Sequence, residues 1–180
     1  MCRNRRALAV LPLISFLSGC VTVNMPASNT SDAYESPMQR FRRSMDETRN
    51  LAVAIESHMV DYASNPKVGE TSLRIGPHSL CDISALAEAL ATYRPHLQPL
   101  DPYGRPYLYW LSPDGRHYAV LCLGAEGKLR HESEVEALLT ALTVRGLVLK
   151  RINIACFQDP VLFADGEFLT FPEGDVRTCP

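Results

Sequence analysis

A segment that begins at Ser36 has the residue spacing of an amphipathic helix, and this helix restricts the folds that the chain can adopt. Ser36 can cap the first turn, Pro37 suits the first helical position, and Gln39 can complete a capping box. Largely apolar residues then recur at alternating steps of four and three, which places them along one side of a helix: Phe41, Met45, Thr48, Ala52, Ile55, Met59 and Tyr62. Ser64-Asn65-Pro66 ends the pattern. We therefore predict a helix that buries one face against a core.

The pattern changes from helical to strand-like after residue 106. Residues 107–111 and 117–123 alternate in the way that strands do, and Ser112-Pro113-Asp114-Gly115 forms the turn between them. Residues 161–164 and 167–171 flank Asp165-Gly166, a typical two-residue hairpin turn. Residues 152–157 are a further strand candidate.

Two shorter helices and a loop complete the predicted elements. Residues 67–80 are rich in Gly and Pro and predict a loop, after which Asp82 can cap a second helix. Ser133 and Glu136 can cap a third helix that runs through Leu142. The expected fold class is α+β, with a long N-terminal helix packed on a small antiparallel sheet in one domain.

The first twenty residues have the organisation of an export leader. Arg3, Arg5 and Arg6 precede an apolar run, 7–17, that is too short to span a bilayer. Leu17-Ser18-Gly19-Cys20 follows, and this pattern resembles the lipobox of bacterial lipoproteins, in which the cysteine carries diacylglycerol. The alternative is an ordinary secretory signal that ends in cysteine. We expect a signal peptide over 1–19, a flexible tether over 20–35 and a globular domain over 36–180.

The charge of the chain argues against nucleic acid as a partner. The formal net charge is −2 and includes the three leader arginines, so the chain after Gly19 carries about −5. A mildly acidic domain without a basic stripe lacks the positive field that nucleic-acid binding requires.

The cysteines are consistent with an oxidising compartment. If Cys2 leaves with the leader and Cys20 carries lipid, four cysteines remain, which can form two disulfides in three connectivities: Cys81, Cys122, Cys156 and Cys179. We favour Cys122–Cys156, which would join two strands, and Cys81–Cys179, which would hold the C-terminal region. No C-x-x-C pair or cysteine–histidine spacing indicates zinc, and we expect no cofactor.

Four segments resemble, in the correct order, the major (G-type) pseudopilins of type II secretion systems. Residues 45–56 are similar to the family's amphipathic helix, and residues 101–109 are similar to its D-P-W-G-x-P-Y strand entry, with Tyr103 in place of the tryptophan. Residues 118–127 are similar to the next strand and its loop, and residues 163–168 are similar to a closing hairpin. The resemblance covers about residues 40–172. It implies a pseudopilin-like domain, here carried on a lipoprotein.

Three departures from this family bear on function. The long apolar N-terminal helix that packs the pseudopilin filament is replaced by Cys20 and a tether, so we do not expect polymerisation of that kind. The family's calcium loop keeps few oxygen ligands here, and Glu126 and Glu132 are only weak candidates, so we expect no metal. Residues 132–149 predict an inserted helix and an apolar strand-like run.

No group of residues has the spacing of a catalytic site. No G-x-S-x-G or phosphate-binding loop is present. The histidines show no metal-ligand or nucleophile–base spacing: His58, His78, His96, His117 and His131. We therefore expect no catalytic residue. Tyr107, Tyr109, Trp110 and Tyr118 are expected in the core, with a carbohydrate- or peptide-stacking surface as the alternative.

These observations lead to one functional expectation and one alternative. The expectation is a non-catalytic envelope protein, held by lipid on Cys20 on the periplasmic side of a membrane and acting on a protein partner. The outer membrane is favoured because Val21 is not the aspartate associated with inner-membrane retention. The partner expected from the resemblance is a type II secretion or pilus-type apparatus, contacted through a sheet edge or the third helix. The alternative is a periplasmic lipoprotein hydrolase whose site side chains are scattered in sequence. No small-molecule substrate is indicated.

Overall fold

The computed structural model describes residues 35–145, 151–154, 156 and 159–171. These residues all belong to one compact unit, Tyr34–Pro180. The predicted leader, Cys20, most of the tether and Cys179 lie outside the described residues, so the predicted boundaries at residues 19 and 35 stay predictions.

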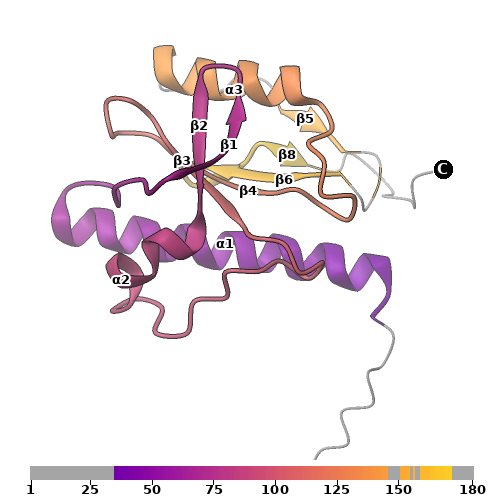
Figure 1. Ribbon diagram of the computed structural model, residues 1–180, viewed down its shortest axis with the longest axis horizontal. Helices are drawn as coiled ribbons and strands as arrows, with labels where there is room; N and C mark the ends of the chain where they lie inside the picture. Colours follow the sequence, from indigo (N-terminus) through magenta and orange to yellow (C-terminus); the bar gives the residue numbers. More distant parts are fainter. Residues whose placement is uncertain (1–34, 146–150, 155, 157–158, 172–180) are drawn as a thin grey trace, which may run out of the picture. The chain divides into compact units, whose positions relative to one another are not determined.

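An antiparallel sheet of six strands lies at the centre of this unit (Figure 1). The strands are, in their order across the sheet, β1 (Thr71–Ile75), β2 (His78–Asp82), β3 (Leu108–Leu111), β4 (Tyr118–Cys122), β6 (Val161–Ala164) and β7 (Glu167–Phe168). Two further short strands pair in parallel: β5 (Ile152–Asn153) and β8 (Thr170–Phe171).

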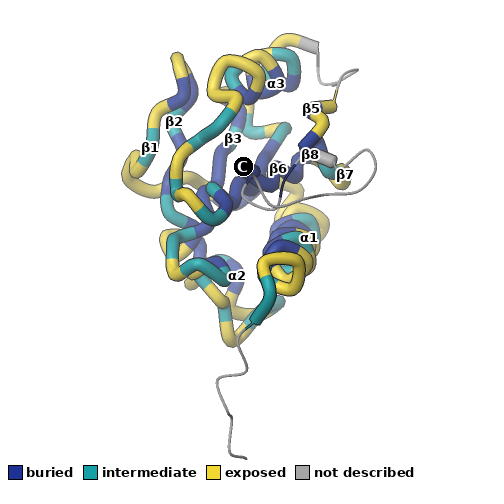
Figure 2. The backbone as a smooth tube through the Cα atoms, turned by 90° about the vertical axis from the view of Figure 1, so that its right-hand side faces the viewer, coloured by how far each residue is buried: buried dark blue, intermediate teal, exposed yellow. Residues whose placement is uncertain are grey.

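Helices cover both faces of the sheet, as Figures 1 and 2 show. On one face lie α1 (Pro37–Tyr62), the 3₁₀-helix η1 (Ile83–Leu86) and α2 (Ala87–Leu90), and on the other lies α3 (Glu132–Arg145). Strand residues alternate between the two cores: Tyr109 packs toward α1, whereas Leu108 and Trp110 pack toward α3. The predicted α+β class, a helix on a small antiparallel sheet, is confirmed.

The N-terminus of α1 has the predicted capping box. The hydroxyl of Ser36 accepts from the Gln39 amide at 3.3 Å, and Gln39 Oε1 accepts from the Ser36 amide at 2.8 Å. Of the predicted apolar stripe, Phe41, Thr48, Ala52 and Ile55 are buried, and Met45 is partly buried. Its last members are exposed, Met59 at 36% and Tyr62 at 65%, because the helix extends past its core.

The prediction of a loop over residues 67–80 was wrong, because β1 and β2 form a hairpin there. Its turn is Gly76-Pro77, and Gly76 has φ +54°, a left-handed conformation that favours glycine. The strand predicted over residues 152–157 was also too long, because only Ile152–Asn153 is a strand, and residues 155 and 157 lie outside the described residues.

The favoured disulfide pairing was wrong. Cys81 and Cys122 are free, buried thiols. Neither thiol is therefore joined to Cys156 or Cys179 as predicted. The two also cannot join each other, because they lie on β2 and β4 with β3 between them, and strands two places apart are separated by about 10 Å. Cys156 is disulfide-bonded, and Cys179 lies outside the described residues.

No helix in the described part of the chain combines the length and the apolar character that a membrane span requires.

Candidate functional site

The segment from Asp101 to Tyr107 folds around the carboxylate of Asp101, which is buried. Its Oδ1 accepts from the backbone amides of Tyr103 and Arg105, each at 2.9 Å. Its Oδ2 accepts from the thiol of Cys122 on β4 at 3.3 Å. The motif is therefore fastened to the sheet by one carboxylate.

Arg105 of the same motif reaches the loop that follows β4. Its guanidinium donates to the carbonyl oxygens of Gly124 and Ala125, and a Cβ at Gly127 would lie 2.3 Å from Arg105 Nε. Of the weak calcium candidates, Glu126 forms an ion pair with Arg130, and Glu132 lies at the start of α3. The guanidinium of Arg105 thus holds the loop. Sequence reasoning missed this arrangement because no sequence signal shows where an arginine points.

The two free thiols lie in surroundings that keep them protonated. Burial and then the neighbouring Asp101 carboxylate raise the pKa of Cys122 to about 12. Burial likewise raises the pKa of Cys81. A cysteine nucleophile needs a lowered pKa and access to solvent, so neither thiol has the character of a nucleophile.

Among the five histidines, His117 has the surroundings that most resemble those of a general base. Its Nδ1 lies 2.6 Å from Oδ2 of Asp165, which orients the ring as a general base is oriented. The nearby Ser112 hydroxyl donates to Asp114 at 2.5 Å and accepts from the His117 backbone amide. Within the described residues, no serine, threonine or cysteine donates to the ring of His117, so a base and its orienting acid are present without a nucleophile.

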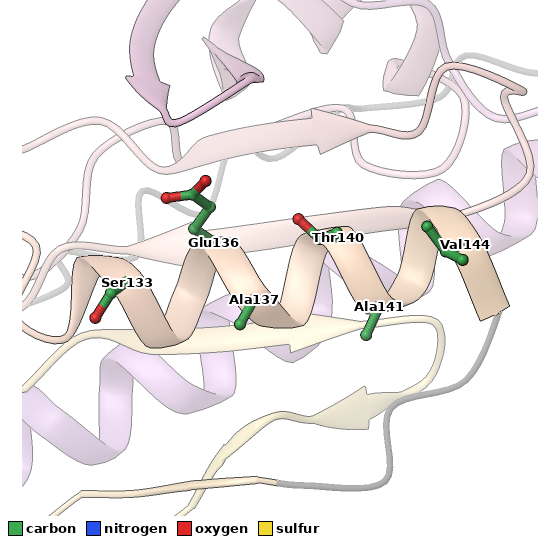
Figure 3. A pocket seen from close by; sticks show the side chains of 6 residues that line it. All are labelled: Ser133, Glu136, Ala137, Thr140, Ala141 and Val144. Atoms are coloured by element: carbon green, nitrogen blue, oxygen red, sulfur yellow. The ribbon is translucent and has the colours of Figure 1, made fainter.

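The outer face of α3 combines exposure with apolar character (Figure 3). Its inner face buries Val135, Leu138, Leu139 and Leu142 against the sheet. Its other side borders an open hollow lined by Ser133, Glu136, Ala137, Thr140, Ala141 and Val144. Val144 is 74% exposed. A helix with apolar side chains on both sides normally packs on both sides, and the described residues cover α3 on one side only.

The β1–β2 hairpin borders this face of α3. His78 Nε2 lies 2.9 Å from the Thr140 hydroxyl, and the ring of His78 meets Trp110 edge-on at 5.6 Å. A Cβ at Gly76 would lie 2.3 Å from the Glu136 carboxylate. Desolvation lowers the pKa of His78, although Glu136 opposes the effect. The hairpin and α3 therefore form one continuous surface that ends at β1, an edge strand among the described residues.

A second pocket lies between the end of α1 and the η1–α2 segment. It has a volume of about 460 Å³, and its walls include His58, Tyr62 and the buried Asn65. Of the other histidines, His96 and His131 are exposed. The tyrosines at 107, 109 and 118 and Trp110 are buried, as expected of core residues.

Comparison of the chain with protein-family models, curated proteins and solved structures finds no match. Among the described residues, no three histidine, cysteine or acidic side chains are grouped so that they could hold a metal ion. The site therefore has to be interpreted from its own geometry.

Proposed function

We propose that this protein is a non-catalytic envelope protein, anchored by lipid on Cys20, whose pseudopilin-like domain acts through protein–protein contacts. The observation that carries the contact function is the outer face of α3. Ala137, Ala141 and Val144 give that face an apolar surface with small side chains, over which a partner's backbone can approach closely.

The topology supports an inserted contact element in a pseudopilin-like fold. β4 and β6 are adjacent in the sheet, yet residues 123–160 lie between them in the chain. This insertion carries α3 to the sheet face opposite α1. A sheet with α1 on one face is what the resemblance implies, and the insertion adds a helix on the other. A type II secretion or pilus-type apparatus is the partner that this proposal favours.

The proposal is tested by co-purification from detergent-solubilised membranes. Glu in place of Ala137 or Val144 puts a charge on the outer face of α3 and should remove the bound partner. Ala87→Glu, at an exposed alanine of α2, is the matched control and should retain it. If all three variants recover the same partner in the same yield, the outer face of α3 is not the contact surface.

A hydrolase remains the second candidate because of the His117–Asp165 pair. Such an enzyme would hydrolyse a simple ester such as p-nitrophenyl acetate faster than free imidazole does, and His117→Ala would abolish the excess rate. The contact function predicts no such excess.

A further inference from the structure

We propose that the pocket at the end of α1 binds an uncharged carbohydrate ring, an activity separate from protein contacts on α3. The elements that line it, the end of α1 and the η1–α2 segment, lie on the opposite side of the sheet from α3. Its volume of about 460 Å³ lies within the usual range of small-ligand sites. Aromatic, amide, charged and apolar side chains share its walls, among them His58, Tyr62, Asn65, Lys67, Leu86 and Glu88.

An aromatic shelf forms one wall of this pocket. The rings of His58 and Tyr62 pack at 4.6 Å with a tilt of 31°, and Tyr93 meets His58 edge-on at 6.3 Å. Tyr93 is itself held by its hydroxyl, which donates to Asp61 at 2.6 Å. Tyr62 stays 65% exposed. Because an aromatic face carries partial negative charge, it attracts the C–H bonds on the face of a sugar ring.

Asn65 supplies a hydrogen-bond acceptor without a partner. Its side chain is 5% exposed, and its Nδ2 donates to the carbonyl oxygen of Gly115 at 3.0 Å. Its Oδ1 is buried and accepts no hydrogen bond from the described residues. A buried acceptor is normally satisfied, and because this oxygen is closed to water, a ligand hydroxyl would reach it only after the Asn65 side chain moves.

The polar groups of the pocket favour a neutral ligand rich in hydroxyl donors. The pocket lies at the C-terminus of α1, where unpaired carbonyls give negative potential, which disfavours anions. His58 Nδ1 donates to the Ser64 carbonyl at 3.1 Å, since a carbonyl can only accept, and this leaves Nε2 of the neutral ring as an acceptor. Lys67 and Glu88 add one charge of each sign, so the rim has no net charge.

The test is ligand-observed NMR with full-length protein in a detergent that has no sugar headgroup. The probes are maltotriose, cellotriose and N,N′,N″-triacetylchitotriose, with inorganic phosphate as the anion. We expect at least one trisaccharide to bind with Kd on the order of 1 mM or below. Tyr62→Ala should weaken that binding about tenfold, because it removes the stacking surface.

Val60→Ala is the matched control, since Val60 is exposed on the same helix but does not line the pocket. It should bind as the unmodified protein does. Equal melting temperatures will show that both variants fold. Glu88→Gln tests independently whether the charge balance of the rim matters for binding. The proposal is overturned if no trisaccharide binds, if Tyr62→Ala and Val60→Ala bind equally well, or if phosphate displaces the sugar.

Discussion

Arg105 lies against the loop that follows β4, and its Nη2 donates a hydrogen bond to the carbonyl oxygen of Ala125 at 2.7 Å. A second nitrogen of the same guanidinium donates to the carbonyl of Gly124. The proposed resemblance to pseudopilins implies a calcium ion at this loop. Here a side chain of the preceding motif supplies the positive charge, and that motif is fastened through Asp101 to Cys122.

Replacing Arg105 by alanine should destabilise the domain, because two backbone carbonyls lose a charged donor. The expected loss is about 2 kcal/mol in the free energy of unfolding, measured by urea denaturation. Arg116→Ala is the control, since that side chain is 81% exposed. Calcium should leave the melting temperature of the unmodified protein unchanged. A stable Arg105→Ala variant, or a clear rise in melting temperature with calcium, would contradict this account of the loop.

Cys81 and Cys122 should resist a thiol reagent at about pH 8 until the protein unfolds, because burial keeps both thiols protonated. Mass spectrometry after iodoacetamide treatment, with and without urea, measures this directly. Labelling of either cysteine in the folded protein would show that the core around it opens.

The free energy of unfolding should fall at acid pH, because His78 becomes protonated more readily in the unfolded chain than in the folded protein. Burial lowers its pKa in the folded protein below the ordinary 6.5, so the unfolded chain binds the proton more readily. The contribution of neutral His78 is therefore complete above pH 6.5 and is lost as the pH falls through the folded-state pKa. Urea denaturation at about pH 7.5 and about pH 5 should show a smaller loss for His78→Gln than for the unmodified protein.

His96→Gln, at an exposed histidine, is the control for this experiment. It should keep the full dependence on pH. If His78→Gln and His96→Gln lose the same stability in acid, His78 is not the group responsible.

Cys20→Ser should release the protein from membranes, because a serine cannot carry the thioether-linked lipid. Fractionation with antibody detection measures the soluble and pelleted shares. Ser18→Ala, a change between small residues in the same motif, should leave the protein in the pellet. Continued pelleting of Cys20→Ser would rule out the lipid anchor.

Features that depend on neighbouring residues could be predicted from the sequence. The Ser36–Gln39 capping box and the Asp82 cap are both present, since each joins residues at most three apart. The Asp165-Gly166 turn also formed as predicted, with both residues at positive φ. Local hydrogen bonding and backbone preference determine such features.

Features that depend on strand order could not be predicted. The β1–β2 hairpin was missed because Gly76-Pro77 is as typical of an irregular loop as of a hairpin turn. The disulfide pairing failed because nothing in the sequence marks Cys81 and Cys122 as free thiols buried in the sheet. The orphan acceptor of Asn65 depends on Gly115, fifty residues away in the chain. Long-range contacts of this kind have no local signature.

The contact function on α3 is tested most directly by a photo-crosslinking amino acid placed at position 144 in living cells. Position 49 on α1, which is exposed on the other side of the sheet, serves as the reference. We predict a discrete crosslinked adduct from position 144 that disappears when Ala137→Glu is added, and none from position 49. Absence of an adduct at position 144, or equal adducts from both positions, would contradict the account.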